Sequence, residues 1–246
     1  METTRDAFLG GRVLLDQPVQ GYRAGLDAVL LAAAVESMPG NSFAEAGCGA
    51  GAALLMAAMR RPDAAFTGIE KDGHAGELAA ANATLNGVAL RVGISAADLL
   101  HMPLAAKTGF DVVFANPPFF DDETAIRPPH PTRHDSFIAG CPLSVWVHAM
   151  LDLCGARGRI VIIHRAERLG DLLAALAGKA GDIVLYPVRP RAHDPAKRLI
   201  LAARKGAKGP VKLLRGLDLH GEAGERFTPE AQAIFDGAPI SLYPDH

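Results

Sequence analysis

The stretch FAEAGCGAGAALL, residues 43–55, joins a short apolar run, three closely spaced glycines and a segment rich in alanine and leucine. This order predicts a buried strand, a tight loop and a helix, the repeating unit of α/β folds. Because glycine has no Cβ, Gly47, Gly49 and Gly51 let a ligand approach the backbone closely where the helix begins. We therefore expect an α/β fold with its ligand site at this loop.

The alternation of strands and helices continues along most of the chain. Expected strands span residues 42–46, 66–70, 90–94, 110–115, 159–164, 183–188 and 198–203, and expected helices span 26–35, 51–60, 76–86, 144–154 and 168–177. Such alternation favours a mostly parallel sheet with helices on both faces. The last two strands have no helix between them, so we expect an antiparallel hairpin at one edge. The predicted fold is a Rossmann-like, seven-stranded α/β domain.

The chain divides into three expected parts. Residues 1–38 form an N-terminal extension, residues 39–205 the α/β domain, and residues 206–246 a C-terminal addition packed on the same domain. Residues 120–140 form a long irregular loop, and a loop of this length inside a compact domain is often functional.

The composition is that of a globular protein, with 49% hydrophobic and 21% charged residues among 246, and it excludes a disordered chain. The formal net charge of −2 gives no general attraction to nucleic acids or anionic membranes, so such binding needs a local patch. The cysteines are Cys48, Cys141 and Cys154, too few and too scattered for a disulfide framework, which favours the reducing cytoplasm. We expect neither a signal peptide nor a membrane span.

Acidic residues lie at three positions where strands end near the glycine loop. Glu70 follows Gly51 by 19 residues and could bind two ribose hydroxyls, as in both nicotinamide and S-adenosylmethionine sites. The third glycine comes one residue earlier than in the dinucleotide pattern, and Glu45 suits an ammonium group better than a pyrophosphate. These features favour S-adenosylmethionine. Asp98 could accept from an adenine amino group, although it could equally cap a helix.

A second motif, DVVFANPPFF at residues 111–120, ends a buried strand with an amide and two prolines. Proline cannot donate a ladder hydrogen bond, so the strand has to stop at Asn116. The two prolines restrict the backbone and hold the Asn116 side chain and nearby carbonyls in a stiff turn. This turn could present fixed acceptors and an aromatic face to a ligand. The alternative is a strand end with Phe119 packed in the core.

The two motifs together, Glu-x-Gly-x-Gly-x-Gly followed by Asn-Pro-Pro-Phe, resemble those of amino methyltransferases that use S-adenosylmethionine on planar nitrogens. The resemblance implies that the Asn116 side-chain oxygen and the Pro117 carbonyl accept the two N–H groups of the substrate amine. A delocalised amine then becomes more nucleophilic, and Phe119 stacks on the base. Positioning for in-line attack would supply most of the acceleration.

Three further stretches narrow the resemblance: QPVQGYRAGLDAVLLAAAV at residues 17–35, RHDSF at 133–137 and GRIVIIHRAERL at 158–169. From Phe8 to beyond Leu201 the chain resembles bacterial tRNA adenine-N6 methyltransferases, which modify the base beside the anticodon of a valine tRNA. The resemblance implies that Tyr22, Arg23 and Asp27 close the cofactor pocket, although they could also be ordinary helix-capping residues. Sister families with the same motif methylate guanine N2 or protein glutamine.

The substrate-binding residues are expected on two basic segments. Arg133 and His134 are candidate contacts in the long loop, with a solvated loop as the alternative. Prolines around His130 disfavour a helix that would bring histidines together, so we expect no metal site. A second segment is the best candidate for a phosphate-binding surface, with a solvated hairpin as the alternative; it contains Arg189, Arg191, Lys197, Arg198, Arg204, Lys205, Lys208 and Lys212.

Two hypotheses from other functional classes stay open at this point. An NAD-dependent oxidoreductase would need a different glycine spacing and leaves the Asn-Pro-Pro-Phe motif unexplained. A non-catalytic RNA-binding module would not need the intact Glu45, Glu70 and Asn116. The sequence leaves the oligomeric state open.

Overall fold

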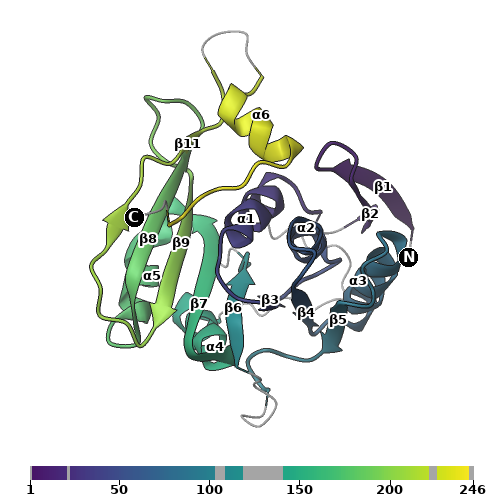
Figure 1. Ribbon diagram of the computed structural model, residues 1–246, viewed down its shortest axis with the longest axis horizontal. Coiled ribbons are helices and arrows are strands. Elements are labelled where there is room, and N and C mark those ends of the chain that lie inside the picture. Colours follow the sequence, from purple (N-terminus) through teal and green to yellow (C-terminus); the bar gives the residue numbers. More distant parts are fainter. Residues whose placement is uncertain (1, 21–22, 103–108, 119–140, 222–225, 244–246) are drawn as a thin grey trace.

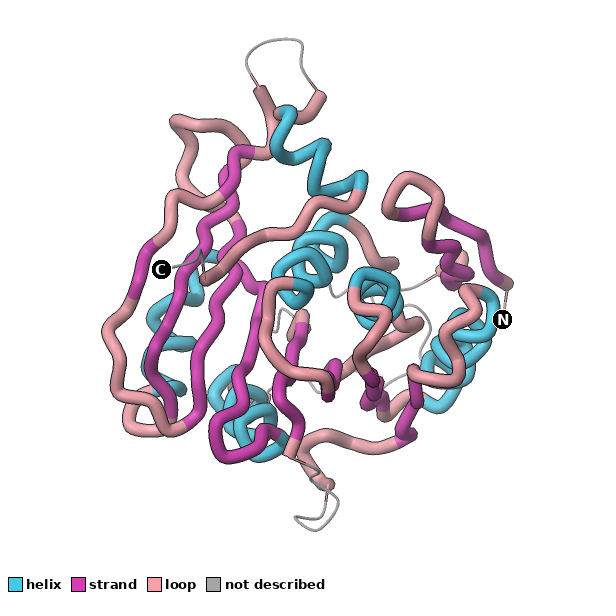
Figure 2. The backbone as a smooth tube through the Cα atoms, in the orientation of Figure 1, coloured by secondary structure: helices cyan, strands magenta, loops and turns pink. Residues whose placement is uncertain are grey.

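The computed structural model describes residues 2–20, 23–102, 109–118, 141–221 and 226–243, and its main feature is one large twisted sheet (Figures 1 and 2). In the described residues the sheet has nine strands. Along the sheet they are β10 (Lys212–Leu213), β8 (Ala180–Arg189), β9 (Arg198–Lys205), β7 (Cys154–Arg165), β6 (Phe110–Ala115), β3 (Ser42–Ala46), β4 (Ala65–Glu70) and β5 (Val92–Ala96), while β11 (Leu217–Asp218) also pairs with β8.

The strand directions confirm the expected topology. All neighbouring pairs are parallel except the two that involve β9, which runs antiparallel to both β7 and β8. The seven expected strands are all present, and the short β10 and β11 extend the sheet beyond them. Because the parallel strands point the same way, β3, β4, β6 and β7 all end at one edge, called here the carboxyl edge.

Helices cover both faces of the sheet. One face packs against α1 (Leu26–Glu36), α2 (Ala52–Arg60) and α3 (Gly73–Leu85), and the other against α4 (Leu143–Leu153) and α5 (Leu169–Leu176), which follows a short helix, η2 (Ala166–Arg168). Successive side chains of β7 alternate between the two cores: Val161 and Ile163 belong to the first, Ile160 and Ile162 to the second. A strand buried on both faces explains the continuous apolar run in its sequence.

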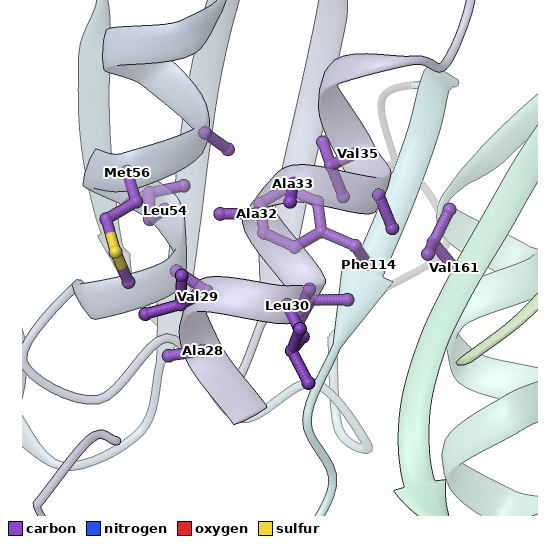
Figure 3. Packing of buried hydrophobic residues seen from close by; sticks show 14 of the residues in the cluster. Ala28, Val29, Leu30, Ala32, Ala33, Val35, Leu54, Met56, Phe114 and Val161 are labelled. Carbon is purple, nitrogen blue, oxygen red and sulfur yellow. The ribbon is translucent and has the colours of Figure 1, made fainter. Parts of the chain in front are cut away.

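Helix α1 is buried on every side. Its residues from Ala28 to Val35 are all buried, because the helix packs against α2, β7 and the C-terminal helix α6 (Pro229–Asp236). Figure 3 shows Leu30, Ala32 and Ala33 of α1 close to Phe114 of β6, with Leu54 of α2 beside them. The segments 1–38 and 206–246 therefore share a core with residues 39–205.

The N-terminal residues form a hairpin, β1 (Thr3–Phe8) and β2 (Val13–Pro18), which the sequence patterns did not predict. Two asparagines hold it, Asn82 of α3 and Asn86, which caps the end of that helix. The Asn82 side chain accepts from the Asp16 N–H at 2.9 Å and donates to the Asp16 and Ala50 carbonyls at 2.9 and 3.0 Å. Asn86 pairs in the same way with the N–H and carbonyl of Leu14. The buried amide of Asn82 thus joins the hairpin to the glycine loop.

Several element boundaries differ from expectation; β8, for example, begins at Ala180 instead of residue 183. Helix α3 begins at Gly73 instead of residue 76, because the Asp72 side chain accepts from the N–H groups of His74 and Ala75 at 2.9 and 3.2 Å. Strand β5 begins at Val92 because Leu90 lies fully exposed in the preceding turn. Strand β7 begins at Cys154, directly after α4, instead of at residue 159.

Candidate active site

The loop between β3 and α2 has the tight geometry that its glycines predict. Gly47, Gly49 and Gly51 all have positive φ angles, of 70°, 53° and 87°. A Cβ on Gly47 would lie 2.9 Å from the Trp146 ring, whereas one on Gly49 would meet no described atom within 4 Å. Backbone strain and packing therefore require glycine at position 47, whereas Gly49 borders space that no described atom fills.

Glu70 holds this loop from the end of β4. Its Oε2 accepts from the Gly49 N–H at 2.9 Å, and its Oε1 accepts from the Asp72 N–H at 2.9 Å. Each carboxylate oxygen has two acceptor sites, so both keep one for a hydroxyl group. The half-buried Glu70 can bind a diol while it fixes the loop.

Glu45 is buried under the loop, with 4% of its surface exposed, and its Oε2 has no hydrogen-bond partner among the described residues. Burial raises the pKa of Glu45 well above its ordinary value; a hydrogen bond from the Leu54 backbone opposes this, and the charge of Glu70 adds to it. An ionised carboxylate here lacks compensation until a cation arrives. The site therefore fits the ammonium group of an S-adenosylmethionine molecule.

Asp98 follows β5 and already has two local partners. Its side chain accepts from the Leu100 N–H at 3.0 Å and pairs with His101 Nδ1 at 2.9 Å. Burial alone would raise the pKa of Asp98, but the hydrogen bonds from His101 and Leu100 outweigh it, and the pKa lies below its usual value. Asp98 thus caps a turn, not the helix that was the alternative, within the described residues, and a contact with adenine stays a prediction.

Asn116 and Pro117 end β6 at the carboxyl edge. Glu45 and Phe114 are register partners in the parallel pair β3–β6, so the Asn-Pro-Pro turn and the glycine loop leave adjacent strands side by side. Asn116 is half-buried, Pro117 buried and Pro118 exposed. This geometry places the expected amine acceptors next to the expected cofactor loop. Phe119, Arg133 and His134 lie outside the described residues, as does the loop 120–140.

The three residues expected to close the cofactor pocket have different surroundings. Tyr22 lies outside the described residues. Arg23 donates to Thr4 Oγ1 at 2.7 Å and to the Pro18 carbonyl at 3.0 Å, and forms an ion pair with Asp6, so all of these bonds tie it to the hairpin. Asp27 forms an ion pair with Arg198 at 2.9 Å, which joins α1 to β9. The structure thus pairs an expected cofactor residue with an expected phosphate contact.

The expected basic surface is divided between two edges of the sheet. Arg198 is the register partner of Arg165 at the carboxyl edge, and Lys197 precedes it. Arg204 and Lys205 lie at the opposite end of β9, where Arg204 faces Asp182 at 3.6 Å and the Lys205 ammonium donates to the Cys154 carbonyl at 2.9 Å. An eight-residue strand separates its ends by about 24 Å. Lys197, Arg198, Arg204 and Lys205 therefore do not form one continuous surface, contrary to expectation.

One residue at the carboxyl edge was missed at the sequence level. His164, the penultimate residue of β7, lies beside the Asn-Pro-Pro turn, since Ile162 of the same strand is the register partner of Ala115. It is 4% exposed, and burial lowers its pKa to about 4, so the imidazole is neutral near pH 7. The sequence signal that could have identified it is a histidine near the end of an otherwise apolar strand, as in IVIIHR.

The described residues contain no cluster of three or more metal-binding side chains. Among the helices described here, none has the length and apolar character needed to cross a membrane.

Comparisons with known proteins agree with this geometry. Residues 24–128 match the family model of the methyltransferase small domain. A structure described as a predicted O-methyltransferase from Agrobacterium tumefaciens superposes with a TM-score of 0.72 and 23% identity, covering 87% of this chain and 97% of that one. An S-adenosylmethionine-dependent O-methyltransferase from Thermotoga maritima gives a TM-score of 0.54 at 15% identity, covering 77% and 68%. These structures share the fold of this chain, and the matching family model is that of a methyltransferase domain.

Sequence relatives define the family more closely. A protein of Porphyromonas gingivalis named tRNA1(Val) (adenine(37)-N6)-methyltransferase is 33% identical over 205 residues, which cover 79% of each chain. A protein of the same name from Yersinia pestis is 29% identical over 192 residues, 75% of each chain. The chain belongs to this family, as the resemblance of its motifs predicted.

Proposed function

We propose that this protein transfers a methyl group from S-adenosylmethionine to the N6 amino group of an adenine in the anticodon loop of a tRNA. The observation that carries the proposal is that Asn116 and Pro117 directly follow β6, the strand that pairs with the Glu45 strand β3. The names of the relatives, which act on adenine 37 of a valine tRNA, support the choice of substrate.

The cofactor supplies an electrophilic methyl group, so the protein has to hold and orient both reactants. Glu45 would face the cofactor's ammonium, Glu70 its ribose hydroxyls, and Gly49 would leave room beside the loop. The Asn116 oxygen and the Pro117 carbonyl would accept the two N–H groups of adenine, which draws the nitrogen lone pair out of the ring. Phe119 would stack on the base, and Tyr22 and Arg23 in the extension 1–38 would cover the cofactor.

The direct test is mass spectrometry of nucleosides from purified tRNA after incubation with the enzyme and isotopically labelled S-adenosylmethionine. Labelled N6-methyladenosine in the anticodon loop is the expected product. Labelled N2-methylguanosine, or label in a protein glutamine instead of RNA, would show that the proposed acceptor is wrong and that the protein is nevertheless a methyltransferase. Unlabelled RNA and protein would overturn the proposal.

The role of Glu70 can be measured without RNA. We expect Glu70→Ala to weaken binding of S-adenosylhomocysteine by about 1.5–3 kcal/mol, the contribution of hydrogen bonds to a charged group. Isothermal titration calorimetry measures this loss. Glu77→Ala, an exposed acid on α3, is the control and should bind as the wild type does. Equal affinity in all three proteins would place Glu70 outside the cofactor site.

The proposed chemistry needs no metal ion and takes place in the cytoplasm, where tRNA is modified. We therefore expect the methylation rate to stay the same after exhaustive treatment with a chelator. A radiolabelled methyl-transfer assay before and after treatment measures it. A loss of activity that added Mg²⁺ or Zn²⁺ restores would show a metal requirement; parallel melting curves of the tRNA exclude an effect on RNA folding.

A further inference from the structure

The loop between β8 and β9 presents basic side chains at the carboxyl edge of the sheet. Arg191, His193 and Lys197 are exposed there, and Asp194 is the one acid among residues 190–197. Within the described residues neither Arg191 nor Lys197 has an ion-pair partner, whereas Arg189 pairs with Asp218 at 2.5 Å and Arg198 with Asp27. Two cations in this loop are therefore available to a ligand in solution.

The backbone of this loop is held from three sides. Its own turn closes with the Asp194 N–H on the Arg191 carbonyl at 3.0 Å. The Lys197 carbonyl accepts from the Ala166 N–H at 3.2 Å, which ties the loop to the end of β7. The His220 N–H donates to the Pro190 carbonyl at 2.8 Å, which ties it to the C-terminal segment. The two cationic side chains thus extend from a fixed backbone, so binding costs little conformational entropy of the loop.

The loop also lies at a suitable distance from the Asn-Pro-Pro turn. Strand β9 is separated from β6 by β7 alone, so Lys197 at its start is about two strand spacings, roughly 10 Å, from the strand that carries Asn116. An RNA loop that places one base at Asn116 carries phosphates on both sides of that base. Phosphates are the usual partners of exposed lysine and arginine in RNA complexes.

We propose that Arg191 and Lys197 bind phosphates of the RNA that flank the target base, and that the basic residues at the opposite edge do not. This inference rests on the proposed function for its choice of RNA, and it replaces the continuous surface expected from the sequence. Arg204 and Lys205 are bound to Asp182 and Cys154 at the far end of β9, about 24 Å away. A phosphate near the target base is out of their reach.

The test compares two double charge reversals of equal size. Arg191→Glu with Lys197→Glu changes the proposed surface, and Lys179→Glu with Lys208→Glu changes exposed lysines at the opposite edge. The probe is unmodified tRNA, with Kd measured by fluorescence anisotropy over a range of salt concentrations. We expect the first variant to lower the slope of log Kd against log salt by about 1.4–1.8, because each lost phosphate contact lowers it by about 0.7–0.9. The second variant should keep the wild-type slope.

The outcomes separate this inference from the proposed function. Wild-type methylation of tRNA with equal slopes in all three proteins, or with the larger loss in the Lys179 and Lys208 variant, would overturn the phosphate surface alone. If the first variant lost slope but the wild type did not methylate tRNA, the phosphate-binding surface would be supported and the proposed function overturned. Absence of tRNA binding by the wild type would overturn both. Unchanged affinity for S-adenosylhomocysteine shows that the variants are folded. If charge reversal prevents folding, the double variant Arg191→Gln with Lys197→Gln replaces it and should give the same loss of slope.

Discussion

Replacement of Asn116 by alanine should lower kcat by about two orders of magnitude or more while S-adenosylhomocysteine binds as before. The amide oxygen would contact the substrate amine most strongly as the nitrogen becomes pyramidal, so its loss raises the barrier and leaves cofactor binding nearly intact. Asn116 directly follows Val112 to Ala115 of β6, which are all buried. Because these residues hold the strand in place, the substitution should not disturb it. Single-turnover methylation of tRNA and calorimetry with S-adenosylhomocysteine measure the two quantities.

The matched control is Asn41→Ala, which removes the same kind of side-chain amide from an exposed position before β3, at the opposite edge of the sheet. Its kcat should equal that of the wild type. If Asn116→Ala raised only the KM for tRNA and kept kcat, the side chain would bind substrate without favouring the transition state. In that case the acceptor role proposed for Asn116 would be wrong.

The sheet could be predicted because the information is local. Each central strand is a short apolar run bounded by glycine, proline or polar residues, and β3 and β6 were predicted with their observed bounds. The hairpin β1–β2 could not be predicted in this way. It is held by the side chains of Asn82 and Asn86, which follow Asp16 and Leu14 by 66 and 72 residues. Such tertiary hydrogen bonds leave no periodic signal in the sequence.

The candidate site, too, could be predicted only where its residues are close together in the sequence. Glu45, Gly47 and Gly49 are neighbours in sequence, so their meeting in space follows from one strand–loop–helix unit. The expected phosphate surface failed as a continuous patch because sequence neighbours on a strand need not be neighbours in space. Lys197 and Lys205 are only eight residues apart, yet an extended strand carries them to opposite edges. Local clustering of charge indicates a surface reliably only within a loop or along one face of a helix.

Glu45→Gln should show opposite effects on stability and on cofactor binding. Because its folded-state pKa is raised, the folded protein holds more protons than the unfolded chain above the ordinary glutamate value of 4.5. The stability of the wild type therefore falls as pH rises through the interval between 4.5 and the raised pKa. Glutamine stays neutral, so the variant should be the more stable protein above that interval. Urea unfolding at several pH values measures the difference.

The same substitution should weaken S-adenosylhomocysteine binding by about 2–5 kcal/mol, since it leaves a buried ammonium without its counter-charge. Wild-type affinity should rise with pH through the same interval, because the carboxyl has to lose its proton to pair with the ammonium, and the variant should lack this dependence. Calorimetry in buffers of different ionisation enthalpy should detect proton release in the wild type alone. Glu77→Gln, at an 83% exposed side chain, should match the wild type in every measurement. A Glu45→Gln protein that is more stable at high pH yet binds with wild-type affinity would show that Glu45 is buried for packing, and that the ammonium lies elsewhere.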